Sequence, residues 1–279
     1  MSDTNAQSDL QSAYAPFDLP TGVRLAAERG PSGYDTRLVA RELRGSRYRD
    51  IAAWPLRFKG LKPGHGALML DDLVIEPGCR FLDLCSGPIA FFAGFAVQNG
   101  AEEAVAIDID PAFARVDTFE QQPAWFRRVE FRCSDLLGDS IGGKKFDAAA
   151  FHPPMLPLSP NQEWDRHSSY DFSGPDGRDV LDRGIIQLAE AIRPGGHVVI
   201  GQFEFLGVDE QFGLAPSTFD RLRAVGFAPL SAKLVEVPVT PIIDASVPHI
   251  MDTYPRYNFV LRAGQLFHRF AVICARRES

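Results

Sequence analysis

Short apolar runs of strand length alternate with helical stretches through the middle of the chain, and this alternation restricts the fold more than any other feature. Strands are predicted at residues 80–84, 104–108, 129–133, 146–151 and 197–203, and helices at residues 89–98, from Pro111 onward and at residues 176–192. Apolar strands that alternate with helices form parallel sheets whose two faces are both covered. The sequence therefore predicts an α/β domain.

The last third of the chain contains longer extended segments. A helix is predicted from Ser217 to Val225, and extended segments follow at residues 230–237 and 266–275. Between them, residues 238–265 form a Pro-containing connection with many isoleucine and tyrosine side chains. An apolar load of this kind favours packing over disorder. We predict an insertion that forms a lid or a homodimer surface; the alternative is a packed excursion with no substrate role.

The first 59 residues differ from the rest in composition. They begin with a polar stretch typical of a frayed tail and continue with a charged segment at residues 35–49 that predicts a surface helix. An extended piece is predicted at residues 52–63, which leads into the rest of the chain. We therefore divide the chain into a tail with a helical and extended lead-in at residues 1–59 and a main domain at residues 60–279.

Composition excludes several classes of protein. The net charge of −7 argues against a nucleic-acid partner, because binding phosphates needs a basic face. No apolar window approaches the length of a membrane-spanning helix, and the opening residues lack a signal-peptide pattern. The four cysteines show no metal-ligand spacing and no disulfide framework, so no metal is expected. These features predict a cytoplasmic protein.

Polar residues and a glycine follow the predicted strands where the strands end. The first strand runs into Asp83, Cys85 and Gly87, the second ends at Asp108, and the third is followed by Asp135. Ligands of open α/β sheets bind beyond the carboxyl ends of the strands, where the strand order reverses. Each residue alone could be a turn glycine or a helix cap. Their occurrence at successive tips favours a ligand site, in which Asp108 can accept hydrogen bonds from a ribose diol.

The fourth tip carries the sequence His-Pro-Pro-Met at residues 152–155. Two rigid prolines give this tip a fixed direction, which favours a functional role for His152; a loop histidine satisfied by hydrogen bonds is the alternative. His65 and His167 lie where they could approach the same pocket. The other histidines are predicted to be structural or on the surface: His197, His249 and His268.

These tips together resemble the successive motifs of class I S-adenosylmethionine-dependent methyltransferases. The resemblance is carried by residues 81–110, Ser134-Asp135, residues 146–155 and residues 191–196. It is nearest to members with an Asn-Pro-Pro-Tyr loop, such as the release-factor glutamine methyltransferases and related small-domain enzymes. The implied fold is a Rossmann-like doubly wound, mostly parallel seven-stranded sheet with an antiparallel last strand, an N-terminal extension and an insertion before that strand.

The resemblance also implies the cofactor and its contacts. S-adenosylmethionine would place its methionine part over Asp83, Cys85 and Gly87. Its ribose would bind Asp108, and its adenine would contact Asp135 and Leu136.

His152 and Pro153 match the catalytic positions of the family loop. There a side chain and the following carbonyl accept hydrogen bonds from a substrate nitrogen, and so aim its lone pair at the methyl group. Met155 stands in place of an aromatic residue and leaves an adaptable apolar substrate wall, and Ile89 replaces a glycine. A neutral imidazole offers one acceptor nitrogen, so His152 could replace the family asparagine or act as a general base.

The leading hypothesis is methyl transfer from S-adenosylmethionine to a nitrogen or oxygen of a small molecule in specialised metabolism; glutamine methylation of protein is disfavoured by His152 and Met155. One alternative is a methyltransferase fold that catalyses an elimination or cyclisation with His152 as base. A second alternative is a non-catalytic module that binds a cofactor or a partner.

Overall fold

A computed structural model describes residues 24–30, 33–35, 64–87, 90–111, 127–138, 141–160 and 171–279. Several predictions lie outside these ranges. They are the polar tail, the surface helix at residues 35–49 except Asp35, which ends a strand, the extended piece at 52–63, Ile89, the body of the helix from Pro111, and His167.

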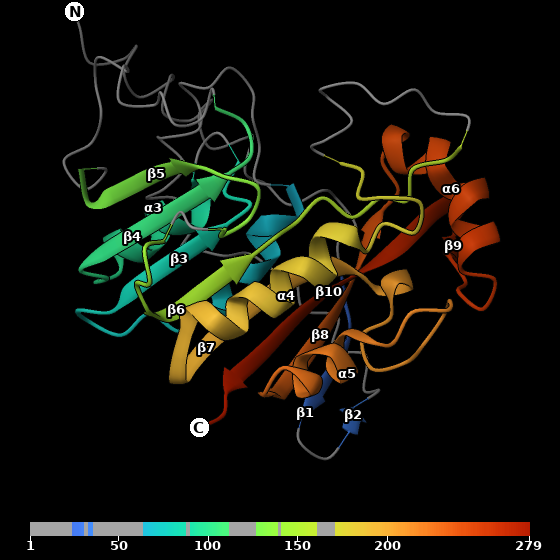
Figure 1. Cartoon of the computed structure of the whole chain (residues 1–279). Coiled ribbons are helices and arrows are strands. Elements are labelled where there is room, and N and C mark those ends of the chain that lie inside the picture. Colours follow the sequence, from blue (N-terminus) through green and yellow to red (C-terminus); the bar gives the residue numbers. More distant parts are fainter. Residues whose placement is uncertain are drawn as a thin grey trace, which may run out of the picture.

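The described strands form one ten-stranded sheet with the order β2-β1-β8-β10-β7-β6-β3-β4-β5, and β9 pairs with β10 (Figure 1). The strands are β1 (Arg24–Gly30), β2 (Gly33–Asp35), β3 (Arg80–Leu84), β4 (Glu103–Asp108), β5 (Val129–Cys133), β6 (Phe146–Phe151), β7 (Ile192–Phe203), β8 (Phe227–Pro238), β9 (Val260–Arg262) and β10 (Gln265–Arg277). The helices are α3 (Phe91–Gln98), α4 (Asp179–Ala191), α5 (Thr218–Ala224) and α6 (Pro241–Thr253), with 3₁₀ turns η4 (Gly64–Asp72) and η8 (Glu204–Leu206).

Seven of these strands make the predicted doubly wound sheet. β3, β4 and β5 pair in parallel on one side, and β3, β6 and β7 pair in parallel on the other. β10 lies antiparallel between β7 and β8. The Rossmann-like fold with an antiparallel last strand is therefore confirmed. Three further strands extend it: β1 and β2 beyond β8, and β9 beside β10.

The direction of winding reverses between β3 and β6. After β3 the chain adds β4 and β5 on one side, and it then crosses to place β6 on the other side of β3. Crevices for ligands form at such a switch point, beyond the carboxyl ends of the two strands. In this chain those ends are followed by Cys85 and His152.

The helices match the apolar pattern of the sequence. α3 lies within the predicted helix at residues 89–98, is buried along most of its length, and packs on β3 and β4. α4 buries one side only, and at Gly184 it approaches β6 so closely that an added Cβ would lie 2.2 Å from the Phe151 ring. α5 begins at the predicted Ser217 cap, whose hydroxyl accepts a hydrogen bond from the Asp220 amide.

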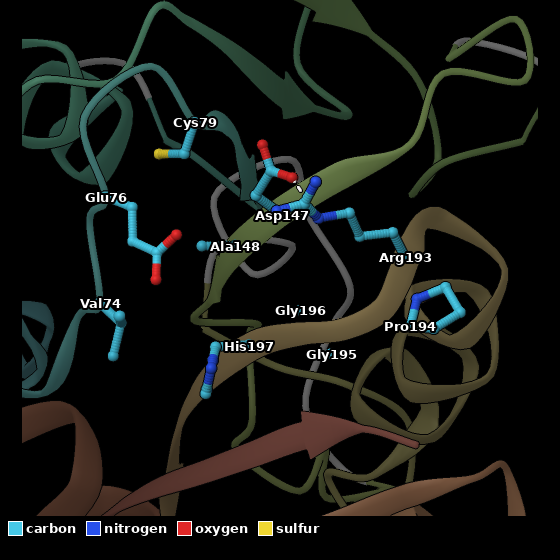
Figure 2. A pocket seen from close by; sticks show the side chains of 10 residues that line it. All are labelled: Val74, Glu76, Cys79, Asp147, Ala148, Arg193, Pro194, Gly195, Gly196 and His197. Atoms are coloured by element: carbon cyan, nitrogen blue, oxygen red, sulfur yellow. Dashed lines mark ion pairs between the residues drawn. The ribbon is translucent and has the colours of Figure 1, made fainter. Parts of the chain in front are cut away.

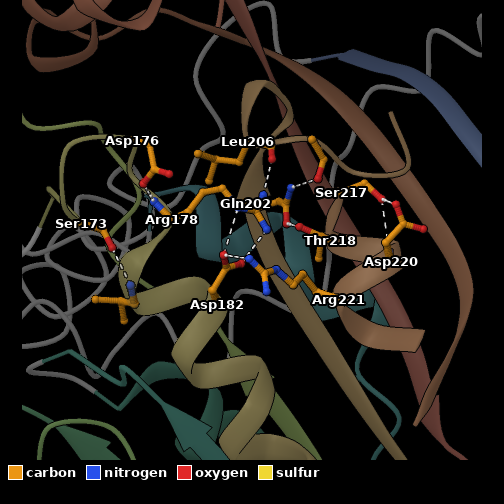
Figure 3. A network of polar contacts seen from close by, with 12 residues as sticks. Ser173, Asp176, Arg178, Asp182, Gln202, Leu206, Ser217, Thr218, Asp220 and Arg221 are labelled. Atoms are coloured by element: carbon orange, nitrogen blue, oxygen red, sulfur yellow. Dashed lines mark hydrogen bonds and ion pairs between the residues drawn. The ribbon is translucent and has the colours of Figure 1, made fainter. Parts of the chain in front are cut away.

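A buried arginine anchors the start of α4 (Figure 3). Arg178 pairs with Asp182 at 2.6 Å and donates to the Leu206 carbonyl, which joins α4 to η8 after β7. In the same network, Thr218 donates to the Gln202 side chain at 2.7 Å and ties α5 to β7. A buried cation needs such partners to offset its desolvation. The network fixes α4 against the carboxyl end of β7.

The segment at residues 238–265 contains α6 and β9, which lie together beside one end of β10 (Figure 1). Its inner side is apolar and buried, with Ile243, Ile250, Tyr254 and Tyr257 all packed in the core. The Tyr254 hydroxyl donates to the Asp176 carbonyl at 2.5 Å, which connects α6 to the approach to α4. Its role as a lid or dimer surface stays a prediction.

Candidate active site

The predicted cofactor residues come together at the carboxyl ends of β3, β4 and β5. Burial is the main cause that raises the pKa of the Cys85 thiol. Further charges act on that thiol from three carboxylates and one guanidinium: Asp108, Asp83, Asp135 and Arg183. Residues far apart in sequence therefore surround one point at the edge of the sheet.

The turn after β3 is built to face a ligand. Cys85 and Gly87 both have φ of 60°, and among the described residues none has an atom within 4 Å of a Cβ added at Gly87, so the space beside this glycine is open on their side. The Gly87 amide donates to Asp108 Oδ2 at 2.9 Å, and Asp108 Oδ1 accepts from the Asp110 amide at 3.1 Å. Asp108 therefore holds the turn and remains partly exposed at the tip of β4.

Asp83 is a fully buried carboxyl group below this turn. Its Oδ2 accepts a hydrogen bond from the Ala93 amide in the first turn of α3 at 2.9 Å, whereas its Oδ1 is buried without a hydrogen-bond partner. Burial raises the pKa of Asp83 to about 7. An unpaired buried oxygen beside an open turn fits a site that receives a hydrogen-bond donor or a cation.

The raised pKa of Asp83 predicts a pH-dependent stability. In the folded protein the Asp83 carboxyl group stays protonated up to about pH 7, whereas its ordinary pKa, taken for the unfolded chain, is 3.8. The contribution of this protonation to stability is therefore complete below pH 3.8 and is lost as the pH rises through 7. Between pH 5 and pH 8 the free energy of unfolding of wild type should fall by roughly 2–3 kcal/mol because of Asp83. Asp83→Asn should lack this fall. Urea titrations of both proteins at the two pH values measure it; an identical pH dependence would contradict it.

The tip of β5 carries Asp135 and Leu136. The Asp135 side chain is 56% exposed and pairs with Arg183 of α4, whose Nη2 lies 2.7 Å from Asp135 Oδ2. Leu136 is buried with φ of 57°. Arg183 is not predictable as a site residue from the sequence, because α4 follows β6 in the chain and its contact with the β5 tip depends on the sheet order.

His152 stands at the tip of β6 between two glycines. A Cβ added at Gly66 would lie 3.7 Å from its Nδ1, and one added at Gly201 would lie 3.0 Å from its Cδ2. Its Nε2 is buried without a hydrogen-bond partner, and burial lowers the pKa of His152 to about 4. The imidazole is therefore neutral at physiological pH, and at Nε2 it offers either a lone pair or an N–H group.

The loop after His152 is fixed by backbone hydrogen bonds. The amides of Met155 and Leu156 both donate to the Asp171 carbonyl, at 3.0 and 2.7 Å, and the Ser173 amide donates to the Leu156 carbonyl at 2.9 Å. Pro153 is buried, and the Met155 side chain is packed into the core with 4% exposure. The role of Met155 as a substrate wall stays a prediction.

A second imidazole lies close to His152. His65, in η4, has its Nε2 3.1 Å from His268 Nε2 and stacks on Phe270, whose ring also contacts His152. Burial lowers the pKa of His65, and the nearby His268 and His152 lower it further. The structure thus places the predicted His65 beside the β6 tip.

Two polar residues at this edge were not predicted as site residues. His268 is fully buried and its Nδ1 has no hydrogen-bond partner, so it is not a surface histidine. Glu204, directly after β7, has a pKa raised to about 7 by burial, an effect that the nearby Arg269 opposes. No sequence signal marks them, because their burial depends on η4 and on β10.

A cavity of about 260 Å³ lies at the opposite edge, at the amino ends of β6 and β7 (Figure 2). His197 lines it, and the ion pair between Arg193 Nε and Asp147 Oδ1, 2.5 Å apart, crosses its wall. The carboxyl edge holds the predicted site residues, so this cavity is separate from them. His249 contacts the Pro175 carbonyl oxygen at 3.1 Å.

Among the described residues, no group of three or more histidine, cysteine or acidic side chains is arranged to hold a metal ion. Within the same part of the chain, every helix is too short or too polar to cross a membrane. All four cysteines are free thiols.

The strand tips with the predicted site residues lie at the switch point of a doubly wound sheet, where folds of this class bind ligands. A comparison with known proteins adds a relative from Methanocaldococcus jannaschii, described as a "putative protein N5-glutamine methyltransferase", which is 33% identical over 169 residues that cover 60% of this chain and 80% of the relative. No family model matches the chain.

Two solved structures resemble the chain in fold. The [4+2]-cyclase SpnF is 18% identical with a TM-score of 0.47 and covers 97% of this chain and 93% of its own. An S-adenosylmethionine-dependent methyltransferase from Mesorhizobium loti is 16% identical with a TM-score of 0.45 and covers 77% of this chain and 98% of its own. At these scores neither likeness supports a functional conclusion.

The identity and coverage of the Methanocaldococcus relative place the chain in a class and a family. It is a class I S-adenosylmethionine-dependent methyltransferase and belongs to the protein N5-glutamine methyltransferase family. The expected small-molecule substrate is contradicted, because this relative is named for methylating protein. The expected place in specialised metabolism, which depended on that substrate, has no support.

Proposed function

We propose that the chain transfers the methyl group of S-adenosylmethionine to the side-chain amide nitrogen of a glutamine in a protein. The observation that carries this proposal is the neutral His152 imidazole at the switch point, whose buried Nε2 has no partner. The name of the Methanocaldococcus relative supports the substrate class. The lowered pKa removes the earlier objection that a histidine differs from the asparagine of related loops, since a neutral imidazole also accepts a hydrogen bond.

The residues present fit the cofactor. The strand tips follow one another along the sheet in the order β6-β3-β4-β5. This order matches a methyl acceptor at β6, followed by the methionine part, the ribose and the adenine of the cofactor. The open space beside Gly87 and the unpaired Asp83 Oδ1 would receive the methionine part, Asp108 the ribose, and Asp135 with Leu136 the adenine. When bound, the cofactor supplies a methyl group on a positively charged sulfur.

The chain's own residues would then orient the amide. A primary amide has two N–H donors, and His152 Nε2 and the Pro153 carbonyl offer two acceptors in a loop whose backbone is fixed. Orientation of this kind replaces most acid–base work. The amide nitrogen would gain the methyl group and release one proton to solvent, and the cofactor without its methyl group would leave as S-adenosylhomocysteine.

The alternative with His152 as a general base is weakened by the same pKa. A base works best when its pKa lies near the operating pH, and burial lowers the pKa of His152 to about 4. An elimination or cyclisation would therefore need another base. A non-catalytic module would give no reason for an unpaired acceptor at the switch point.

The test uses tritiated-methyl S-adenosylmethionine with the full chain and three matched peptides that present glutamine, asparagine or glutamate in one context. We expect label in the glutamine peptide alone, on the side-chain nitrogen by fragment mass spectrometry, with S-adenosylhomocysteine as co-product. The same peptides serve as controls for one another. Transfer to the glutamate peptide alone, or binding of S-adenosylhomocysteine without transfer to any glutamine, would overturn the amide assignment.

A further inference from the structure

The loop after β5 is held by the side chains of another helix. Arg183 Nη2 contacts Asp135 Oδ2 at 2.7 Å, and Gln187 Oε1 accepts a hydrogen bond from the Leu137 amide at 2.7 Å. Arg183 and Gln187 are four residues apart on α4 and therefore project from one face of the helix. Two neighbouring side chains of α4 thus bind two residues of a short loop, Asp135 and Leu137, which precede them in the chain by 48 and 50 residues respectively.

The loop at residues 134–138, which α4 holds, has a strained backbone. Leu136, between the two contacts, has φ of 57° and a buried side chain, and Gly138 has φ of 44°. A left-handed conformation costs a residue with a side chain roughly 1–2 kcal/mol. Such conformations persist where surrounding contacts determine them, and they concentrate at functional sites. The Ser134 amide, which donates to the Asp108 carbonyl at 2.9 Å, fixes the start of the loop to the ribose-side tip.

The position of α4 is itself fixed. Its first turn is anchored by the buried Arg178, which pairs with Asp182 (Figure 3). Its centre is held by the close approach of Gly184 to the Phe151 ring. Arg183 and Gln187 therefore extend from a rigid support. The same helix packs behind β6, so the loop that would meet the base and the strand that carries His152 depend on one element.

We propose that Arg183 and Gln187 are positioning residues that shape residues 134–138 to recognise the amino group of the cofactor's adenine. This inference rests on the proposed function, through its assignment of adenine to Asp135. Arg183 holds Asp135 through Oδ2, and the carboxylate so oriented presents Oδ1 as an acceptor for the exocyclic amino group. Hypoxanthine has a carbonyl at that position, which is repelled by the carboxylate.

The solvent exposure of Arg183 and Asp135 determines how strongly their contact should affect stability and cofactor binding. The side chains of Arg183 and Asp135 are 43% and 56% exposed, so their ion pair contributes little to stability. A half-exposed hydrogen bond to a charged acceptor is worth on the order of tenfold in affinity. Loss of the contacts from Arg183 and Gln187 is therefore expected to change the selectivity between adenine and hypoxanthine far more than the stability of the fold.

The experiment measures binding of S-adenosylhomocysteine and of S-inosylhomocysteine, its hypoxanthine analogue, by calorimetry to the full chain. Wild type is expected to prefer the adenine form roughly tenfold, Arg183→Met to bring the ratio within about threefold of unity, and Arg183→Lys to restore part of it. Gln187→Leu tests the second contact and is expected to lower the ratio as well. Arg193→Met, which breaks the Arg193–Asp147 pair at the opposite edge, is the matched control and should leave the ratio unchanged.

Two results would overturn the proposal in different ways. If wild type prefers S-adenosylhomocysteine and Arg183→Met keeps that ratio, the positioning role falls and the proposed function stands. If wild type binds neither compound, the proposed function falls and this inference falls with it. Asp135→Asn is a second variant that leaves α4 untouched, and unchanged selectivity in it would also exclude recognition at this loop.

Discussion

Replacing His152 by leucine is expected to lower the turnover of methyl transfer at least roughly 100-fold, because the substrate amide loses an acceptor that orients it. His152→Asn is the matched variant: asparagine has nearly the shape of leucine but carries an acceptor oxygen, and it should retain activity within about tenfold of wild type. Affinity for S-adenosylhomocysteine should stay unchanged in both, since His152 stands at the acceptor end of the proposed site. Transfer to the glutamine peptide and calorimetry measure the two quantities.

The pH profile separates an acceptor from a base. Burial lowers the pKa of His152 to about 4, so the ratio of wild-type to His152→Asn activity should be constant near neutral pH, where Asp83 titrates in both proteins, and should fall only as the pH approaches 4, where protonation removes the lone pair. Activity that declines below pH 6–7 in wild type and not in His152→Asn would show a base of ordinary pKa and contradict the acceptor role.

The alternation of apolar strands and helices was sufficient to predict the sheet. The strands at residues 80–84, 129–133 and 146–151 were predicted with the bounds that the structure has, because each is a short run of strand length between clear breaks. β7 begins at Ile192, five residues before the predicted start at residue 197, because Ile192 pairs with Phe146 of β6. The register shifts between Phe146 and Ala148, so the intervening residues 193–196 form an irregularity in the strand, which the local sequence does not predict.

The site was predictable where it follows from strand order and was missed where it follows from packing. Asp83, Asp108 and Asp135 follow successive parallel strands, so their meeting at one edge could be inferred from the chain. Arg183 and His268 reach the edge from α4 and from the antiparallel β10. Nothing in their local sequence marks a role, because burial and neighbours are set by elements distant in sequence.

Gly177→Ala is expected to reduce the free energy of unfolding by about 3 kcal/mol and to impair methyl transfer with it. Gly177 has φ of 78°, and an added Cβ would lie 2.3 Å from the Met155 carbonyl oxygen and 3.0 Å from the Pro157 nitrogen. Both are backbone atoms of the loop that follows His152, so no flexible side chain can move aside. Left-handed strain contributes about 1 kcal/mol and the forced shift of the loop roughly 2 kcal/mol.

Gly143→Ala is the matched control for this substitution. Gly143 has φ of 75°, but an added Cβ there would meet nothing within 4 Å, so only the conformational strain of about 1 kcal/mol is expected. Urea titrations measure the free energy of unfolding of both variants, and the difference between their losses of stability gives the contribution of the steric clash at Gly177. Equal losses of stability in the two variants would contradict a clash with the loop. Turnover should fall in Gly177→Ala alone while S-adenosylhomocysteine affinity is kept, because a shift of about 1 Å in the loop misplaces His152 and leaves the tips of β3, β4 and β5 where they are.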